Sequence, residues 1–312
     1  MHNLNNITVW TALITPMLNN GDIDYKSLTN CVRKQENAGN GILIVGSTGE
    51  GLALTQVEQR EIVSYVMSLN LSVPVMAGVG GYQLQSQLEW LDFCETQSVD
   101  AYLLVEPIYA KPGLNGQVRW FETLMDRVNK PCMLYNVPSR TGSNLMPEVL
   151  TELKDHENLW ALKEASGSLD TFMSYQRANP SIRIYSGEDG LISELASLGA
   201  YGVVSVVANV WPEATRAFME HCLQDDHFCL IDQLTIQDIQ LWKRASNALF
   251  VASNPIPAKA ILAHKKWIES AELRPPLCAQ DMVKLDELIS VSQEITHWYE
   301  LQHKFDITTQ AA

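Results

Sequence analysis

Short runs of apolar residues rich in Val, Ile and Leu recur eight times between residues 7 and 207. Most are continuously apolar rather than alternating, which is typical of parallel strands buried on both faces. Amphipathic stretches with helix start signals separate them, such as Thr55 followed three residues later by Glu58. The predicted strands cover residues 7–15, 41–46, 73–79, 101–107, 131–137, 159–165, 182–186 and 201–207.

Successive strand starts are about 20 to 35 residues apart, enough for a strand, a loop and a crossover helix. Eight such units predict an α/β fold of the closed (β/α)8 barrel type, the TIM barrel, with a C-terminal helical extension. An open doubly wound sheet is the alternative, but no GxGxxG motif follows the first strand. We predict a catalytic barrel over residues 1–224 and a helical extension over 225–312, with helices at 228–251, 257–269 and 280–301.

The charge balance restricts the partners. The chain carries 22 Lys and Arg against 36 Asp and Glu, a net charge of -14, which repels nucleic acid and anionic membranes. Small anionic substrates must then be bound by a few local cations. The N-terminal stretch lacks the features of a signal peptide, and the six cysteines show no framework spacing. We therefore expect a cytoplasmic protein with reduced, mostly buried thiols and no nucleic-acid or membrane partner.

Lys163 lies in the middle of the sixth apolar run. In a (β/α)8 barrel the chemistry lies where strands pass into the following loops, so a lysine in such a strand is a candidate catalytic residue. Burial disfavours the ammonium, and the neutral amine attacks a carbonyl carbon to form an imine. The alternative is a structural lysine paired with a carboxylate such as Glu188.

Three residues at the ends of the fourth and fifth strands suit the same cavity. Tyr135 offers a phenol that can carry protons, and Arg140 offers a guanidinium that binds a carboxylate at two points. Tyr109 is either another phenol on the catalytic face or an interface aromatic.

A glycine-rich turn follows the second strand and contains Ser47 and Thr48, whose hydroxyls and backbone amides suit an anionic oxygen. The turn is not a P-loop, because no Gly-Lys-Ser/Thr follows. Glu188 and Asp189, together with Glu50, suggest a metal-dependent barrel enzyme as an alternative from another class. We favour the lysine chemistry, which requires neither metal nor cofactor.

Four motifs occur in order: GSTGE at 46–50, YNVPSRTG at 135–142, KEASG at 163–167 and NPIP at 254–257. In this order and spacing they resemble the dihydrodipicolinate synthase and N-acetylneuraminate lyase family, most closely its synthase branch, over nearly the whole chain. The resemblance implies a barrel with a helical C-terminal extension. It also implies a class I aldolase-like lyase of lysine and diaminopimelate biosynthesis, which joins pyruvate to aspartate 4-semialdehyde without a metal.

The resemblance also implies residue roles. Lys163 forms the imine with pyruvate, and Tyr135 carries protons. Thr48 and Tyr109 match the hydroxyls that link Tyr135 to solvent. Ser47 and Thr48 match the site of the pyruvate carboxylate, and Arg140 matches the residue that binds the semialdehyde carboxylate. Gly187 and Val204 match backbone or small apolar positions around the site. The counterpart of Tyr109 reaches in from a neighbouring subunit, which implies a homodimer or homotetramer.

Arg140 favours the synthase over a lyase for 2-keto-3-deoxy sugar acids or N-acetylneuraminate. That lyase stays open as an alternative, and so does a barrel that has lost catalysis and serves as a binding protein. Positions matching the lysine-binding regulatory site of feedback-inhibited members lack the glutamate expected to pair with lysine's α-amino group. They are Gln56, Gln59, Tyr82, Ser86 and Ile108. We predict weak or absent inhibition by lysine.

Overall fold

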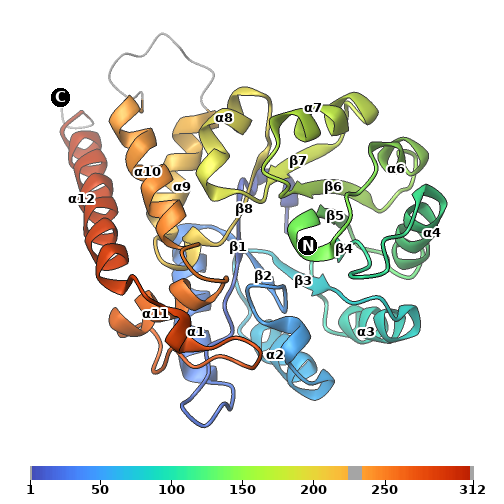
Figure 1. Cartoon of the computed structure of the whole chain (residues 1–312), viewed down its shortest axis with the longest axis horizontal. Helices are drawn as coiled ribbons and strands as arrows, with labels where there is room; N and C mark the ends of the chain where they lie inside the picture. The colour runs from blue at the N-terminus through green and yellow to red at the C-terminus, as the bar shows by residue number, and fades with distance from the viewer. Residues whose placement is uncertain (1, 224–233, 310–312) are drawn as a thin grey trace.

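The computed structural model describes residues 2–223 and 234–309, and its centre is a closed barrel of eight parallel strands in chain order (Figure 1). Each strand pairs with its neighbours in sequence, and β8 closes the ring against β1. The predicted barrel is therefore confirmed and the open sheet is excluded. The strands are β1 (Val9–Ala12), β2 (Gly41–Ile44), β3 (Val75–Val79), β4 (Ala101–Val105), β5 (Cys132–Asn136), β6 (Leu159–Glu164), β7 (Arg183–Ser186) and β8 (Gly202–Ser205).

Helices surround the barrel, as crossover connections between parallel strands require. The capping box predicted at Thr55 and Glu58 is present at the start of α2. The helices of this layer are α1 (Tyr25–Ala38), α2 (Gln56–Ser68), α3 (Leu84–Thr96), α4 (Leu114–Met125), α5 (Pro138–Thr141), α6 (Pro147–Glu152), α7 (Leu169–Ala178), α8 (Ile192–Ser197) and α9 (Pro212–Leu223). Short 3-10 helices are η1 (Leu4–Asn6), η2 (Gly51–Ala53), η3 (Asp189–Leu191), η4 (Val207–Asn209) and η5 (Ala279–Asp281). None of the described helices is long and apolar enough to cross a lipid bilayer.

The helical extension consists of α10 (Ile236–Ala248), α11 (Ile256–His264) and α12 (Leu285–Thr309), which lie on one side of the barrel in orange and red (Figure 1). Phe218 of α9 stacks on Trp242 of α10 with ring centroids 4.3 Å apart, so the extension shares an apolar layer with the barrel helices. The predicted boundary at 224/225 lies outside the described residues, and the division into two domains stays a prediction.

Several predicted helix bounds in the extension were wrong. The helix predicted over 257–269 ends at His264, because Lys266 takes a positive φ of 57° that a right-handed helix does not permit. The helix predicted over 280–301 begins later and runs further, as α12, because residues 279–281 form the separate turn η5. The first residues of the helix predicted over 228–251 lie outside the described part of the chain.

Two apolar cores follow from the alternation of side chains along each strand. One fills the barrel interior and includes Trp10, Tyr135, Tyr185 and Val204, and the other lies between the strands and the helices. Because the interior is filled, the cavity that could take a substrate in this fold is expected where the strands end.

Candidate active site

Lys163 sits near the end of β6, with only 5% of its surface exposed. It forms no ion pair with any described residue, so the predicted alternative, a Lys163–Glu188 pair, is not found. Its neighbour in register on β5 is Tyr135, and the Nζ atom lies 4.1 Å from the centroid of the Tyr135 ring. A buried amine that forms no ion pair with a described carboxylate and lies against a phenol ring is thus the centre of the site.

Gly187 leaves room for the Lys163 side chain. A Cβ on residue 187 would lie 2.5 Å from the Cβ of Ala165 and 3.0 Å from the Cε of Lys163, both closer than ordinary carbon contacts. The Gly187 amide donates to the carbonyl of Glu164 at 2.6 Å, which fixes the loop after β7 against the end of β6. The position therefore tolerates no side chain while the lysine keeps its place.

The acidic residues after β7 are protonated more readily than exposed carboxyls. Desolvation by burial, reinforced by the neighbouring Asp189 and opposed by Lys163, raises the pKa of Glu188 to about 7. Burial likewise raises the pKa of Asp189 to about 6, against the lowering effect of hydrogen bonds. One Asp189 oxygen accepts the backbone amide of Val206 at 2.8 Å, so this carboxyl holds the loop after β8.

Glu50 does not join these acids in a metal site. Its carboxylate lies 2.5 Å from the Nζ of Lys259 in α11, and both side chains are essentially fully buried. The other Glu50 oxygen accepts the backbone amide of Arg274 at 2.8 Å. Among the described residues no three His, Cys, Asp or Glu side chains come together as metal ligands. The metal alternative therefore has no common site for its three carboxylates.

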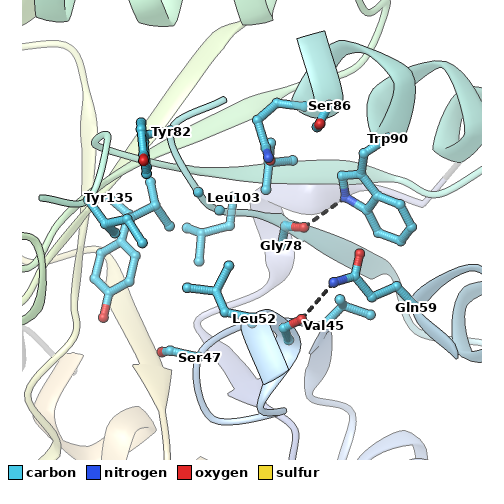
Figure 2. A pocket seen from close by; sticks show the side chains of 18 of the residues that line it. Val45, Ser47, Leu52, Gln59, Gly78, Tyr82, Ser86, Trp90, Leu103 and Tyr135 are labelled. Atoms are coloured by element: carbon cyan, nitrogen blue, oxygen red, sulfur yellow. Dashed lines mark hydrogen bonds between the residues drawn. The ribbon is translucent and has the colours of Figure 1, made fainter. Parts of the chain in front are cut away.

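A cavity of about 840 Å³ opens where the strands end, and its lining includes Tyr135, the register neighbour of Lys163 (Figure 2). Ser47, Tyr135 and Arg140 line it at one end, and both the Ser47 and the Tyr135 side chains lie on that side in Figure 2. Arg140 belongs to α5, which begins with Pro138 immediately after β5, and its guanidinium is exposed without an ion pair to a described residue. Lys163 itself does not line the cavity, because the lysine is buried against Tyr135.

The same cavity also carries the positions predicted to match a regulatory site. Trp90 donates from Nε1 to the carbonyl of Gly78 at 2.9 Å, and Gln59 donates from Nε2 to that of Gly51 at 2.6 Å (Figure 2). No described residue lining the cavity is an Asp or Glu. The matching positions Gln56, Gln59, Tyr82, Ser86 and Ile108 all line it.

The turn after β2 is tight. The Gly51 amide donates to the carbonyl of Gly46 at 3.0 Å, and a Cβ on Gly51 would lie 2.3 Å from the carbonyl oxygen of Val45. Ser47 is exposed at the cavity, whereas Thr48 is 2% exposed and its Oγ1 accepts a hydrogen bond from Nδ2 of Asn254 at 2.9 Å. The two hydroxyls of this turn therefore face different surroundings.

Thr48 does not line the cavity, and Tyr109 and Val204 lie apart from it. Tyr109 is 86% exposed, has a positive φ of 68°, and does not line the cavity of its own chain. Val204 is fully buried in the barrel interior, in the same apolar cluster as Tyr135. The structure therefore brings Lys163, Tyr135 and Gly187 together near the cavity end lined by Ser47 and Arg140.

The family model of the dihydrodipicolinate synthetase family matches residues 5–295 of this chain. The chain belongs to this family. The match covers the barrel and most of the helical extension, and it includes the lysine of β6, the turn after β2 and the Asn254 segment.

Curated relatives of this dihydrodipicolinate synthetase family member are named 4-hydroxy-tetrahydrodipicolinate synthase. One from Francisella philomiragia is 50% identical over 94% of this chain and 97% of its own, and one from Wolbachia pipientis wMel is 42% identical over the same shares. The solved synthase of Methylacidiphilum fumariolicum SolV superposes with a TM-score of 0.87 at 30% identity, covering 95% of this chain and 99% of that one. The predicted family and the predicted lyase of the synthase type are confirmed.

Two residues of the site were not predicted to act there. Asn254 was noted only as part of the NPIP motif, and Lys259 not at all. A signal for Lys259 exists, since it is a lysine within the apolar stretch of α11, as Lys163 is within β6. No local signal links Asn254 to Thr48, because 206 residues separate them.

Proposed function

We propose that this protein condenses pyruvate with aspartate 4-semialdehyde through an imine on Lys163, giving 4-hydroxy-tetrahydrodipicolinate for lysine and diaminopimelate biosynthesis. The observation that carries the proposal is the buried Lys163 amine, which forms no ion pair with a described carboxylate and lies against Tyr135. Only the neutral form of an amine attacks a ketone carbon.

The reaction follows from this amine. Nitrogen attack on the ketone carbon of pyruvate forms a carbinolamine, whose hydroxyl leaves as water to give the imine. Loss of a proton from the methyl group gives an enamine, whose carbon attacks the aldehyde of the second substrate to form a carbon–carbon bond. The amine of that substrate then attacks the imine carbon, closes the ring and releases Lys163.

Each step moves a proton, and we assign this transfer to the Tyr135 phenol. The phenol belongs to the strand next to Lys163 and lines the cavity, so it lies between the amine and open space. In our proposal the Thr48 hydroxyl and Tyr109 of a neighbouring subunit continue the path to solvent. The high exposure of Tyr109 in the single chain supports this role, because a partner could cover it.

Ser47 and Arg140 supply the binding groups. We assign the pyruvate carboxylate to the Ser47–Thr48 turn and the semialdehyde carboxylate to Arg140, whose guanidinium is unpaired among the described residues. Gly187 and Val204 shape the site without taking part in proton transfer. Turnover with aspartate semialdehyde but not with N-acetylneuraminate supports the synthase, and the reverse preference contradicts it.

We further propose a homodimer or homotetramer. Apolar side chains are exposed around this region: Leu52 at 62% and Tyr82 at 60% line the cavity, and Tyr109 at 86% follows Ile108, which also lines it. Such side chains mark a surface that associates with another protein.

The five described cysteines are free, three of them buried, which supports a reducing, cytoplasmic location.

A further inference from the structure

The position of Arg140 depends on the backbone that carries it. Its side chain is exposed and forms no ion pair with a described residue, so no such contact fixes the direction of the guanidinium. It belongs to α5, a single turn of four residues that has no side-chain cap and ends at Thr141. A helix this short is not stable by itself. The groups that hold the chain directly after α5 therefore set where Arg140 lies.

The chain after α5 is bound to Glu106, which follows β4. The Ser143 hydroxyl donates to Oε1 of Glu106 at 2.7 Å, and Nε2 of Gln117 in α4 donates to the same oxygen at 2.8 Å. The Ser143 carbonyl in turn accepts the hydroxyl of Thr141 at 2.8 Å. These hydrogen bonds lead without a gap from Glu106 to the residue next to Arg140.

Glu106 is fully buried, and its other oxygen has no hydrogen-bond partner among the described residues. Burial raises the pKa of Glu106, against the lowering effect of the hydrogen bonds from Ser143 and Gln117. Gln117 holds the same loop, because it accepts the Met146 amide at 2.9 Å and donates to the Asn144 carbonyl at 3.0 Å. Both donors to this costly buried carboxyl thus belong to the loop after α5 or bind it.

We propose that Glu106 is a positioning residue for Arg140, because its buried carboxyl holds the loop that anchors the turn carrying this guanidinium. The inference rests on the proposed function, since it takes the semialdehyde carboxylate as the ligand of Arg140. No described hydrogen bond joins Glu106 to Lys163 or Tyr135. The reaction with pyruvate at the lysine should therefore not depend on Glu106, whereas binding of the second substrate should.

Glu106→Leu and Glu106→Gln test this role as a pair. Leucine has a similar size but no acceptor, whereas glutamine keeps an oxygen that accepts from both Ser143 and Gln117. We expect Glu106→Leu to raise the KM for aspartate 4-semialdehyde by about five- to tenfold, the equivalent of one ordinary hydrogen bond. Glu106→Gln should change it by less than about twofold, and both variants should form the pyruvyl adduct within about twofold of the wild-type rate. An unchanged KM in Glu106→Leu would overturn the proposal.

Ser143→Ala is a milder second variant, which removes only the hydroxyl that joins the loop to Glu106. We expect it to raise the same KM by about fivefold while the pyruvyl adduct forms at the wild-type rate. Ser193→Ala is the matched control, because this half-buried hydroxyl of α8 also donates to a glutamate, Glu194, at 2.8 Å. An equal KM in the two variants, or an adduct rate that falls together with the rise in KM, would overturn the inference.

A double-mutant cycle with Arg140→Ala separates positioning from general damage to the loop. In that background Ser143→Ala should change the KM for the semialdehyde by less than about twofold, because the guanidinium on which the loop acts is gone. The same rise with and without the guanidinium would overturn the inference. A wild type that forms no pyruvyl adduct or does not turn over aspartate 4-semialdehyde would instead contradict the proposed function, and this inference with it, so the two failures are distinct.

Discussion

Gly187→Ala tests how closely the strand ends hold the reactive lysine. The added Cβ would lie 2.5 Å from the Ala165 Cβ and 3.0 Å from the Lys163 Cε. Ordinary carbon contacts begin near ~3.5 Å, so the shortfalls are about 1 Å and about 0.5 Å. Ala165 is fixed to the backbone at the end of β6, whereas Cε belongs to a flexible chain one bond from the reactive nitrogen. The lysine must therefore move.

The cost of this movement appears in both rate and stability. A misplacement of the reacting atom by about 1 Å costs about 100-fold in rate. Overpacking costs about 1 to 3 kcal/mol of the free energy of unfolding. Because the shortfall at the Lys163 Cε is about 0.5 Å rather than 1 Å, we expect adduct formation with pyruvate in Gly187→Ala to slow by about tenfold. The assay quenches the reaction with borohydride at successive times and measures the modified protein by mass spectrometry.

Gly190→Ala is the matched control, because it makes the same change in the same loop. Its added Cβ would meet Ser246 at 3.7 Å, an ordinary contact. We expect its adduct rate to stay within about twofold of wild type and its urea midpoint to change little. The reasoning is refuted if Gly187→Ala reacts as fast as Gly190→Ala, since the lysine would then have room that the structure does not show.

Four further predictions follow from particular side chains. Lys259→Met leaves the Glu50 carboxylate buried and uncompensated, so urea unfolding should show a loss of about 3 to 5 kcal/mol, and Glu50→Gln in the same chain should recover part of it. Arg140→Ala should raise the KM for aspartate semialdehyde by about tenfold or more while leaving pyruvate adduct formation unchanged; an unchanged KM would contradict the assignment of Arg140. The pKa of Glu188 is raised to about 7 from an ordinary 4.5, so between these pH values the folded protein binds more protons than the unfolded chain. The stability of the wild type should therefore fall relative to that of Glu188→Gln as the pH rises through this window. Parallel stability curves of the two proteins would refute this. Lysine should inhibit weakly or not at all, because no described residue lining the cavity offers a carboxylate to its α-ammonium, and an inhibition constant below a millimolar would contradict this.

The strands could be predicted because burial on both faces leaves a signal in each run of sequence. The ends of the strands could not be predicted, because side chains stay buried beyond the point where the backbone hydrogen bonds of the sheet stop. The first strand was predicted to residue 15 but ends at Ala12, while Leu13 and Ile14 remain buried and the Ile14 amide donates to Asn209 instead of a strand. Apolar sequence therefore reports the core rather than the hydrogen-bonded sheet.

The site could be predicted only in part for a similar reason. Lys163, Tyr135 and Arg140 each follow or occupy a strand, so the barrel alone brings them to one end. The bond from Asn254 to Thr48 and the Lys259–Glu50 pair depend on how the extension folds back onto the turn after β2. Nothing within either local stretch specifies that return, so it became visible only in the structure.

The most direct test of the account is to incubate the protein with pyruvate, reduce it with borohydride and map the peptides by mass spectrometry. We expect one reduced pyruvyl group on the peptide that contains Lys163, and we expect Lys163→Ala to show neither the adduct nor turnover. Modification of a different lysine, or full turnover by Lys163→Ala, would contradict the central claim that this buried amine carries the reaction.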